Sequence, residues 1–210
     1  KKVLLVGGGP TTMKVNWNPN DYDLVIPCNH FFLQDRFKKI NIPLAFIGGD
    51  DVDSSENNLE LYNYINSSDT IFCFENRSRP IEEMHTFKRN FPDKCLFMHT
   101  RYRSKIGTIP RIICAMAILN AAEVHIVGMD GFVKGEKLGE KSEHSFQPGK
   151  IRRGTHNYDL YRRHYVILWD YIFNVLGRGK TMIFQNLGEG FETNMSTDIS
   201  KQVFPLNAMN

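Results

Sequence analysis

A glycine-rich turn near the start of the chain is the first segment whose residue types could do chemistry. Gly7-Gly8-Gly9-Pro10-Thr11-Thr12 directly follows the apolar run 3–6. Glycines lack Cβ atoms, so a ligand could approach the main-chain N–H groups of such a turn, and the hydroxyls would help to hold negative charge. The spacing matches neither a dinucleotide fingerprint nor a P-loop, because no Gly-Lys-Ser/Thr follows. The turn is predicted to form one wall of an anion-binding crevice.

Further candidates for the same crevice stand at the ends of other predicted elements: Asn29, Lys105, Gly107, Thr108 and Asp130. Thr108 and Pro110 also fit the start of an apolar helix, as its N-cap and as a residue of its first turn. The amino terminus of that helix would present free amides and a positive dipole end to an anion. These residues and the turn are interpreted together as phosphate-binding.

Clustered carboxylates at Asp50, Asp51 and Asp53 form a second group. An Asp-x-Asp pair after a strand could hold Mg²⁺ or Mn²⁺ against a diphosphate, since hard cations prefer carboxylate oxygens. The same residues suit a solvated turn that caps the next helix, which Ser54-Ser55-Glu56 behind them favours. No metal site is therefore assigned, and Asp51 and Asp53 are kept as the ligands that a metal would use.

Histidines form the third group. His156 lies after a basic stretch and just before the last predicted helix, where its side chain could project over the edge of a sheet. A neutral imidazole near pH 7 suits removal of a proton from an acceptor hydroxyl. His144 and His164 are its rivals for this role.

Alternating strand and helix patterns must position these residues. Strands are predicted at 3–6, 22–27, 43–47, 70–74, 94–98, 123–127 and 181–184, and helices at 31–39, 57–65, 81–90, 111–120 and about 161–175. The alternation predicts an α/β fold, with an open, mostly parallel twisted sheet and helices on both faces. The carboxyl ends of parallel strands line one crevice, which is where ligands bind in such sheets.

Residues 132–156 break the alternation. They are polar and carry several Lys and Arg residues, among them Arg152 and Arg153, without strand or helix periodicity. Long loops of this kind in a compact domain often close over a ligand, so the segment is predicted to be a lid or binding loop.

Composition sets broader limits. A chain of 210 residues fits one domain, and its net charge of +3 disfavours nucleic acid as a partner. Cys28, Cys73, Cys95 and Cys114 are widely spaced, which favours buried free thiols over disulfides or a zinc site. No apolar run is long enough to span a bilayer and no signal peptide is recognisable, so a cytoplasmic location is expected. A homo-oligomer is kept as an open expectation, because the sequence does not determine the oligomeric state.

Several motifs in register resemble the bacterial sialyltransferases of glycosyltransferase family forty-two. The resemblance rests on 7–11, on Tyr22-Asp23-Leu24-Val25 leading into Cys28-Asn29, on Gly107-Thr108, and on 123–130. It covers roughly residues 1–135, and extends more loosely through His156 and the last helix. It implies a Rossmann-like, GT-A-variant domain over 1–210 that binds a CMP-activated sugar without a metal and transfers it with inversion.

The resemblance also implies roles for individual residues. Gly9, Pro10, Thr11 and Asn29 stand where the family contacts the nucleotide, and the segment 107–109 stands where it holds the donor. His156 is the best match to the histidine that acts as the general base. The acceptor would be a glycan or another hydroxyl compound.

Some positions depart from the family. Gly8 replaces an Asn, Lys105 stands in the place of an Arg, and Gly49 falls near another Asn that contacts the nucleotide. Phe132 occupies the place of a tyrosine whose hydroxyl helps the phosphate to leave, and a phenyl ring cannot donate that hydrogen bond. Lys150, Arg152, Arg153 and Tyr158 are the candidates to replace it.

The leading hypothesis is therefore an inverting glycosyltransferase with His156 as its base. The alternatives are a pyrophosphokinase-like enzyme that uses Mg²⁺ at 50–53, an inactive nucleotide-binding module, and a protein that acts on nucleic acid through its basic segments. Dependence on a divalent metal would identify the pyrophosphokinase-like enzyme, and binding of nucleotide without turnover would identify the inactive module. Steep salt dependence of binding would identify the protein that acts on nucleic acid.

Overall fold

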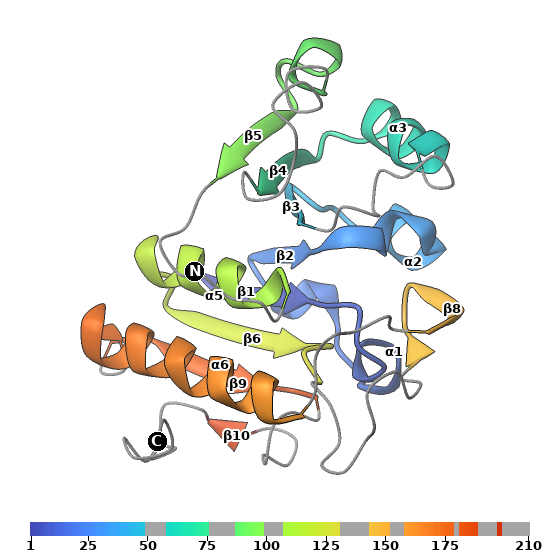
Figure 1. Ribbon diagram of the computed structural model, residues 1–210. Helices are drawn as coiled ribbons and strands as arrows, with labels where there is room; N and C mark the ends of the chain where they lie inside the picture. The colour runs from blue at the N-terminus through green and yellow to red at the C-terminus, as the bar shows by residue number, and fades with distance from the viewer. Residues whose placement is uncertain are drawn as a thin grey trace.

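The structure is a computed structural model that describes residues 1–48, 58–75, 87–98, 107–130, 143–151, 158–178, 181–188 and 197–198 (Figure 1). The strands are β1 (Lys2–Val6), β2 (Leu24–Pro27), β3 (Leu44–Ile47), β4 (Ile71–Glu75), β5 (Cys95–Met98), β6 (Glu123–Val127), β7 (Glu143–His144), β8 (Gln147–Ile151), β9 (Ile183–Asn186) and β10 (Thr197–Asp198). The α-helices are α1 (Thr11–Lys14), α2 (Asp35–Lys38), α3 (Asn58–Ser67), α5 (Ile109–Ile118) and α6 (Tyr158–Asp170). Shorter helical turns are η1 (Pro19–Asp21), η2 (Asn29–Leu33) and the π-helical η3 (Tyr171–Val175).

The central sheet has the order β10-β9-β6-β1-β2, in which β9, β6, β1 and β2 run parallel and β10 is antiparallel to β9. From β1 the chain proceeds outward to β2 on one side, whereas β6 pairs with β1 on the other side. The order of the strands therefore reverses at β1. Such a reversal leaves a crevice outside the carboxyl ends of the strands, because the connections leave in opposite directions.

A second parallel sheet, β3-β4-β5, continues beyond β2 (Figure 1). One bridge, between Cys28 and Phe46, joins the two sheets. The expected single sheet is therefore divided at this point. β2 ends in Pro27, which has no N–H to donate to a neighbouring strand, and Asn29 turns the chain away with a φ of 57°.

Helices cover both faces of the strands. On one face, Val3 and Leu5 pack with α5, α6 and the fully buried Trp169. On the other face, Leu4 and Val6 pack with residues of η2, α2 and α3. Alternate residues of β1 thus enter opposite cores, as expected for a strand buried on both sides. Figure 1 shows α5 and α6 lying side by side across one face of the central sheet. The predicted α/β fold is confirmed.

Most predicted strands and helices agree with the structure to within a few residues. The single helix predicted at 31–39 is instead two short pieces, η2 and α2, because Gln34 between them has an extended backbone with ψ of 125°. The helix predicted at 81–90 lies mostly outside the described residues. Its described part, 87–90, is helical. Gly177 follows η3 with a φ of 63°, so it ends this helical segment.

All four cysteines are free and buried, as predicted. Burial raises the pKa of the Cys28 and Cys114 thiols to about 12 and that of Cys73 and Cys95 to about 11. Thiols with such pKa values carry little thiolate at neutral pH, so they are poor nucleophiles. Among the described helices, none is both long enough and apolar enough to cross a bilayer.

Candidate functional site

The glycine turn lies at the carboxyl end of β1 and is bound directly to the segment that follows β6. The main-chain N–H of Thr11 donates to Oδ2 of Asp130 at 2.9 Å, and the Thr11 hydroxyl donates to Oδ1 of the same carboxylate. That hydroxyl also accepts a hydrogen bond from the N–H of Gly128 at 3.2 Å. Thr11 is 1% exposed, so this network is shielded from water at its centre. It fixes the turn relative to the neighbouring strand.

Most main-chain amides of the turn are used inside the protein. Gly7 N–H donates to Val127 at 2.8 Å, Gly9 N–H to Gly128 at 2.9 Å, and Thr12 N–H to Gly9 at 3.1 Å. Among the described residues, no hydrogen bond involves the N–H of Gly8, and Gly8 is less buried than Gly7 or Gly9. Gly8 is therefore where the turn can offer an amide to a ligand. The predicted role of the turn in phosphate binding remains a prediction.

Close backbone approach explains why the turn needs glycine. A Cβ on Gly7 would lie 2.4 Å from the carbonyl oxygen of Gly128, and a Cβ on Gly9 would lie 2.4 Å from Oδ2 of Asp130. Both distances are far below van der Waals contact, so β1 and β6 can end this close together only with hydrogen atoms at these positions. A Cβ on Gly188, after β9, would likewise lie only 2.3 Å from the hydroxyl oxygen of Thr11.

Asn29 connects three predicted parts of the crevice. Its Oδ1 accepts a hydrogen bond from the N–H of Gly48, after β3, at 2.9 Å, and another from the Thr108 hydroxyl at 3.4 Å. The positive φ of Asn29 is one that Asn tolerates better than most residues, and it turns the side chain toward these partners. The structure thus brings together the ends of β2 and β3 with the start of α5, as the sequence predicted.

The start of α5 lies beside the glycine turn, since a Cβ on Gly7 would lie 3.2 Å from Cγ1 of Ile109. Thr108 is the N-cap residue and Pro110 lies in the first turn, as predicted. The Thr108 hydroxyl bonds Asn29 instead of capping the helix. Gly107 has a φ of 104°, a conformation that requires glycine.

Sequence reasoning missed a buried cation in the same helix turn. Arg111 is 6% exposed, and burial lowers its pKa to about 10. The segment 109–118 was interpreted as an apolar helix, and its arginine was not considered. An arginine inside an otherwise apolar helix nevertheless indicates a specific role for its charge, because buried charges are costly unless they are paired.

A hairpin that the sequence did not predict covers the turn. β7 and β8 form an antiparallel pair inside the segment expected to lack strands. The N–H of Ser145 donates to the carbonyl of Gly8 at 2.9 Å, and the Ser145 hydroxyl donates to that of Gly9 at 2.6 Å. Phe146 is 1% exposed, and its carbonyl accepts a hydrogen bond from Gln34 at 3.1 Å. The hairpin is therefore anchored to both the turn and the core.

Several predicted site residues lie outside the described residues: Lys105, Phe132, Arg152, Arg153, His156 and the carboxylates at Asp50, Asp51 and Asp53. Their predicted roles remain predictions. Within the described part of the chain, no cluster of His, Cys, Asp and Glu has the makings of a metal site.

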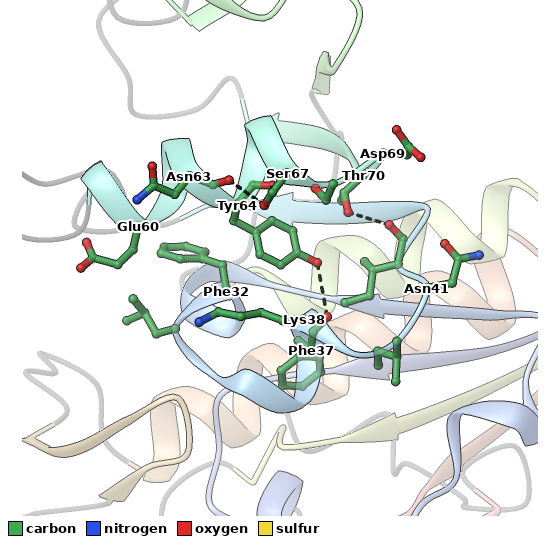
Figure 2. A pocket seen from close by; sticks show the side chains of 14 residues that line it. Phe32, Phe37, Lys38, Asn41, Glu60, Asn63, Tyr64, Ser67, Asp69 and Thr70 are labelled. Carbon is green, nitrogen blue, oxygen red and sulfur yellow. Dashed lines mark hydrogen bonds between the residues drawn. The ribbon is translucent and has the colours of Figure 1, made fainter.

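A cavity of about 730 Å³ lies elsewhere in the molecule, between α3 and the segment from η2 to Ile42 (Figure 2). It adjoins the residues that precede β3 and β4, so it lies at the amino ends of these strands, opposite the edge that carries the glycine turn. Its polar groups are largely engaged, since the Tyr64 and Thr70 hydroxyls donate to main-chain carbonyls and Lys38 pairs with Asp35 at 2.9 Å. It does not belong to the candidate site.

Comparison with solved structures finds the sialyltransferase CstII from Campylobacter jejuni, determined in complex with a substrate analogue, cytidine-5'-monophosphate. The alignment covers 97% of this chain and 88% of that chain, with a TM-score of 0.52 and 14% identity. Similarity at this level of identity shows a common fold. No protein-family model matches the chain, and no curated protein matches it. The resemblance to sialyltransferases is thus confirmed at the level of the Rossmann-like fold.

Proposed function

We propose that this protein is a glycosyltransferase that transfers a sugar from a CMP-activated donor to a hydroxyl acceptor, with inversion at the sugar. One observation carries the proposal: at the point where the strand order reverses, the glycine turn, Asn29 and Thr108 gather at the carboxyl ends of adjacent strands. In open α/β sheets this is the place where nucleotides bind. The shared fold with a sialyltransferase that was determined in complex with cytidine-5'-monophosphate also supports the proposal.

Within the proposed site, Gly8, Pro10 and Asn29 contact the nucleotide, and Gly107 and Thr108 hold the donor near the start of α5. Asp130 acts through Thr11, because both oxygens of its carboxylate receive hydrogen bonds from that residue. Lys105, Arg152 and Arg153 add positive charge opposite the phosphate. His156 removes the proton of the acceptor hydroxyl, and no metal takes part.

A thermal-shift comparison of CMP, UMP, AMP and GMP tests nucleotide binding, since a ligand that binds only the folded state stabilises it according to its affinity. CMP at about 100 times its Kd should stabilise the protein by about 2.7 kcal/mol. The other nucleotides should have smaller effects, and excess EDTA should change none of the shifts. Stabilisation only by a metal-bound nucleotide would contradict the proposal and favour the carboxylates at 50–53 as a metal site.

The variant His156→Ala tests the proposed base. Sugar transfer should fall by about 10²–10⁴-fold, the usual contribution of a general base, while the CMP-induced thermal shift stays near that of the wild type. Full transfer activity in this variant would remove His156 from the mechanism.

A further inference from the structure

The carbonyl groups of the three glycines in the turn are all held by hydrogen-bond donors of the protein itself. The Thr12 hydroxyl donates to the carbonyl of Gly7 at 2.7 Å, and Thr12 is 0% exposed. Ser145 holds the next two carbonyls, since its N–H donates to Gly8 and its hydroxyl to Gly9. A carbonyl oxygen carries partial negative charge and would repel a phosphate that it faced. The turn thus directs its repulsive groups toward internal donors.

The bond from Thr12 also fixes the direction of the Gly8 N–H. The Gly7 carbonyl and the Gly8 N–H belong to one peptide unit, and the described backbone contains only trans peptide bonds. In a trans unit the carbonyl and the N–H point in opposite directions. The Gly7 carbonyl faces the chain after β6, because a Cβ on Gly128 would lie 2.5 Å from its oxygen and still closer to the Thr12 hydroxyl. The Gly8 N–H therefore points away from β6, and it has no hydrogen-bond acceptor among the described residues.

Glycine on both sides makes this peptide unit easy to turn over. Gly7 and Gly8 lack Cβ atoms, so the backbone around the unit tolerates most conformations. If the unit turned over, its carbonyl oxygen would take the place of the N–H. Within the described part of the chain, the Thr12 hydroxyl is the one group that donates to the Gly7 carbonyl. Its hydrogen bond therefore decides between a unit that attracts a phosphate and one that repels it.

We propose that Thr12 is a positioning residue whose hydroxyl holds the Gly8 N–H toward the phosphate of the bound nucleotide. This inference rests on the proposed binding of a CMP-activated donor at this edge of the sheet. The sequence suggested that the hydroxyl itself holds the negative charge, whereas in the structure it is buried and bonded to the backbone. An N–H that is fixed before the ligand arrives costs no reorganisation when the phosphate gains charge on leaving the sugar.

A pair of valine variants separates this role from a general contribution to stability. Thr12→Val removes the hydroxyl that holds the Gly7 carbonyl. Thr70→Val is the matched control, because the Thr70 hydroxyl is also buried and also donates to a carbonyl, that of Ile42, at 2.7 Å. Thr70 directly precedes β4, so it lies at the edge opposite the turn. Each variant leaves one buried carbonyl without its donor, so both should lose stability to a similar extent.

Calorimetric titration with CMP and with cytidine isolates recognition of the phosphate, which cytidine lacks. In Thr12→Val the Kd for CMP should rise about 10- to 100-fold, the effect of losing one hydrogen bond to a charged group, while the Kd for cytidine stays nearly unchanged. Thr12→Ala removes the same hydroxyl with a smaller side chain and should give the same result if valine prevents folding. Thr12→Ser keeps the hydroxyl and should bind CMP nearly as tightly as the wild type. Thr70→Val should bind both ligands as the wild type does.

The outcomes distinguish this inference from the function on which it rests. If the wild type prefers CMP to cytidine and the variants without the Thr12 hydroxyl keep that preference, the role of Thr12 is refuted while the proposed function stands. If these variants weaken both ligands equally, or if Thr12→Ser binds CMP no better than they do, Thr12 only supports the fold and the inference fails. If the wild type neither binds CMP nor releases it from a CMP-linked sugar, the proposed function itself fails, and the role of Thr12 fails with it.

Discussion

Removal of the Asp130 carboxylate should be one of the most damaging single changes near the site, although Asp130 itself is only half-buried. In Asp130→Asn one oxygen can still accept from Thr11, but an NH₂ group then faces the second Thr11 donor. Hydrogen bonds to charged groups contribute about 1.5–3 kcal/mol, and a buried donor left without an acceptor costs about 1–3 kcal/mol. We expect the free energy of unfolding to fall by about 2–4 kcal/mol.

Thr11→Val removes the hydroxyl that the carboxylate and Gly128 share. The N–H of Gly128 is buried and would lose its acceptor, so a loss of about 1–3 kcal/mol is expected. The losses of the two single variants, added together, should exceed the loss measured in the double variant by at least about 1 kcal/mol, because both substitutions act on one network.

Urea unfolding followed by circular dichroism measures these quantities. With a slope of about 2 kcal/mol per molar urea, a loss of 3 kcal/mol moves the midpoint by about 1.5 M. Thr181→Val is the matched control, since this threonine is exposed and its hydroxyl makes only a 3.4 Å contact; it should stay within about 0.5 kcal/mol of the wild type. The reasoning is refuted if Asp130→Asn is as stable as that control, or if the Thr11 and Asp130 losses are simply additive.

Three further predictions follow from other parts of the fold. The buried cysteines, with pKa values of about 11 to 12, should react with a thiol reagent only after unfolding; fast labelling of any of them in the native protein would contradict their burial. Gly107→Ala should cost about 1–2 kcal/mol although a Cβ there meets open space, because the φ of 104° disfavours alanine; an unchanged urea midpoint would show that another conformation is accessible. Burial lowers the pKa of His125, although the carboxylate of Glu123 acts in the opposite direction, with Tyr22 and Lys2 also facing this group. The unfolded chain therefore binds a proton at higher pH than the folded one, so stability should fall as pH decreases through about 6.5, and this part of the pH dependence should be absent in His125→Gln.

The order of strands and helices was predictable because each element carries its own periodicity. The run at β6 was predicted with the bounds that the structure has, and the apolar α5 with its Pro110 and Thr108 start was predicted nearly so. The gathering of Asn29 and Thr108 also followed, since parallel strands place their carboxyl ends at one edge.

What the sequence could not predict depends on contacts between distant residues. Ser145 bonds Gly9 across 136 residues, and no local pattern marks a two-residue strand such as β7 as the partner of a turn. Asp130 was predicted beside the turn, but its bonds to Thr11, 119 residues away, are formed by packing of β1 against β6. The function of a carboxylate at a strand end depends on such partners, which residue type and spacing do not determine.

The split of the sheet at β2 was also missed. Its causes are visible in the chain, because Pro27 lacks an N–H and Asn29 adopts a positive φ. Proline at the end of a strand is compatible with either one sheet or two, so the distinction required the observed pairing of Cys28 with Phe46.

The release of CMP from a CMP-linked sugar, measured with and without a hydroxyl acceptor in the presence of EDTA, tests the central claim most directly. We expect release that is accelerated by acceptor, insensitive to EDTA, and absent for UDP- and GDP-linked sugars at equal concentration. Turnover of a UDP- or GDP-linked sugar that requires Mn²⁺, with no release of CMP under any condition, would contradict it.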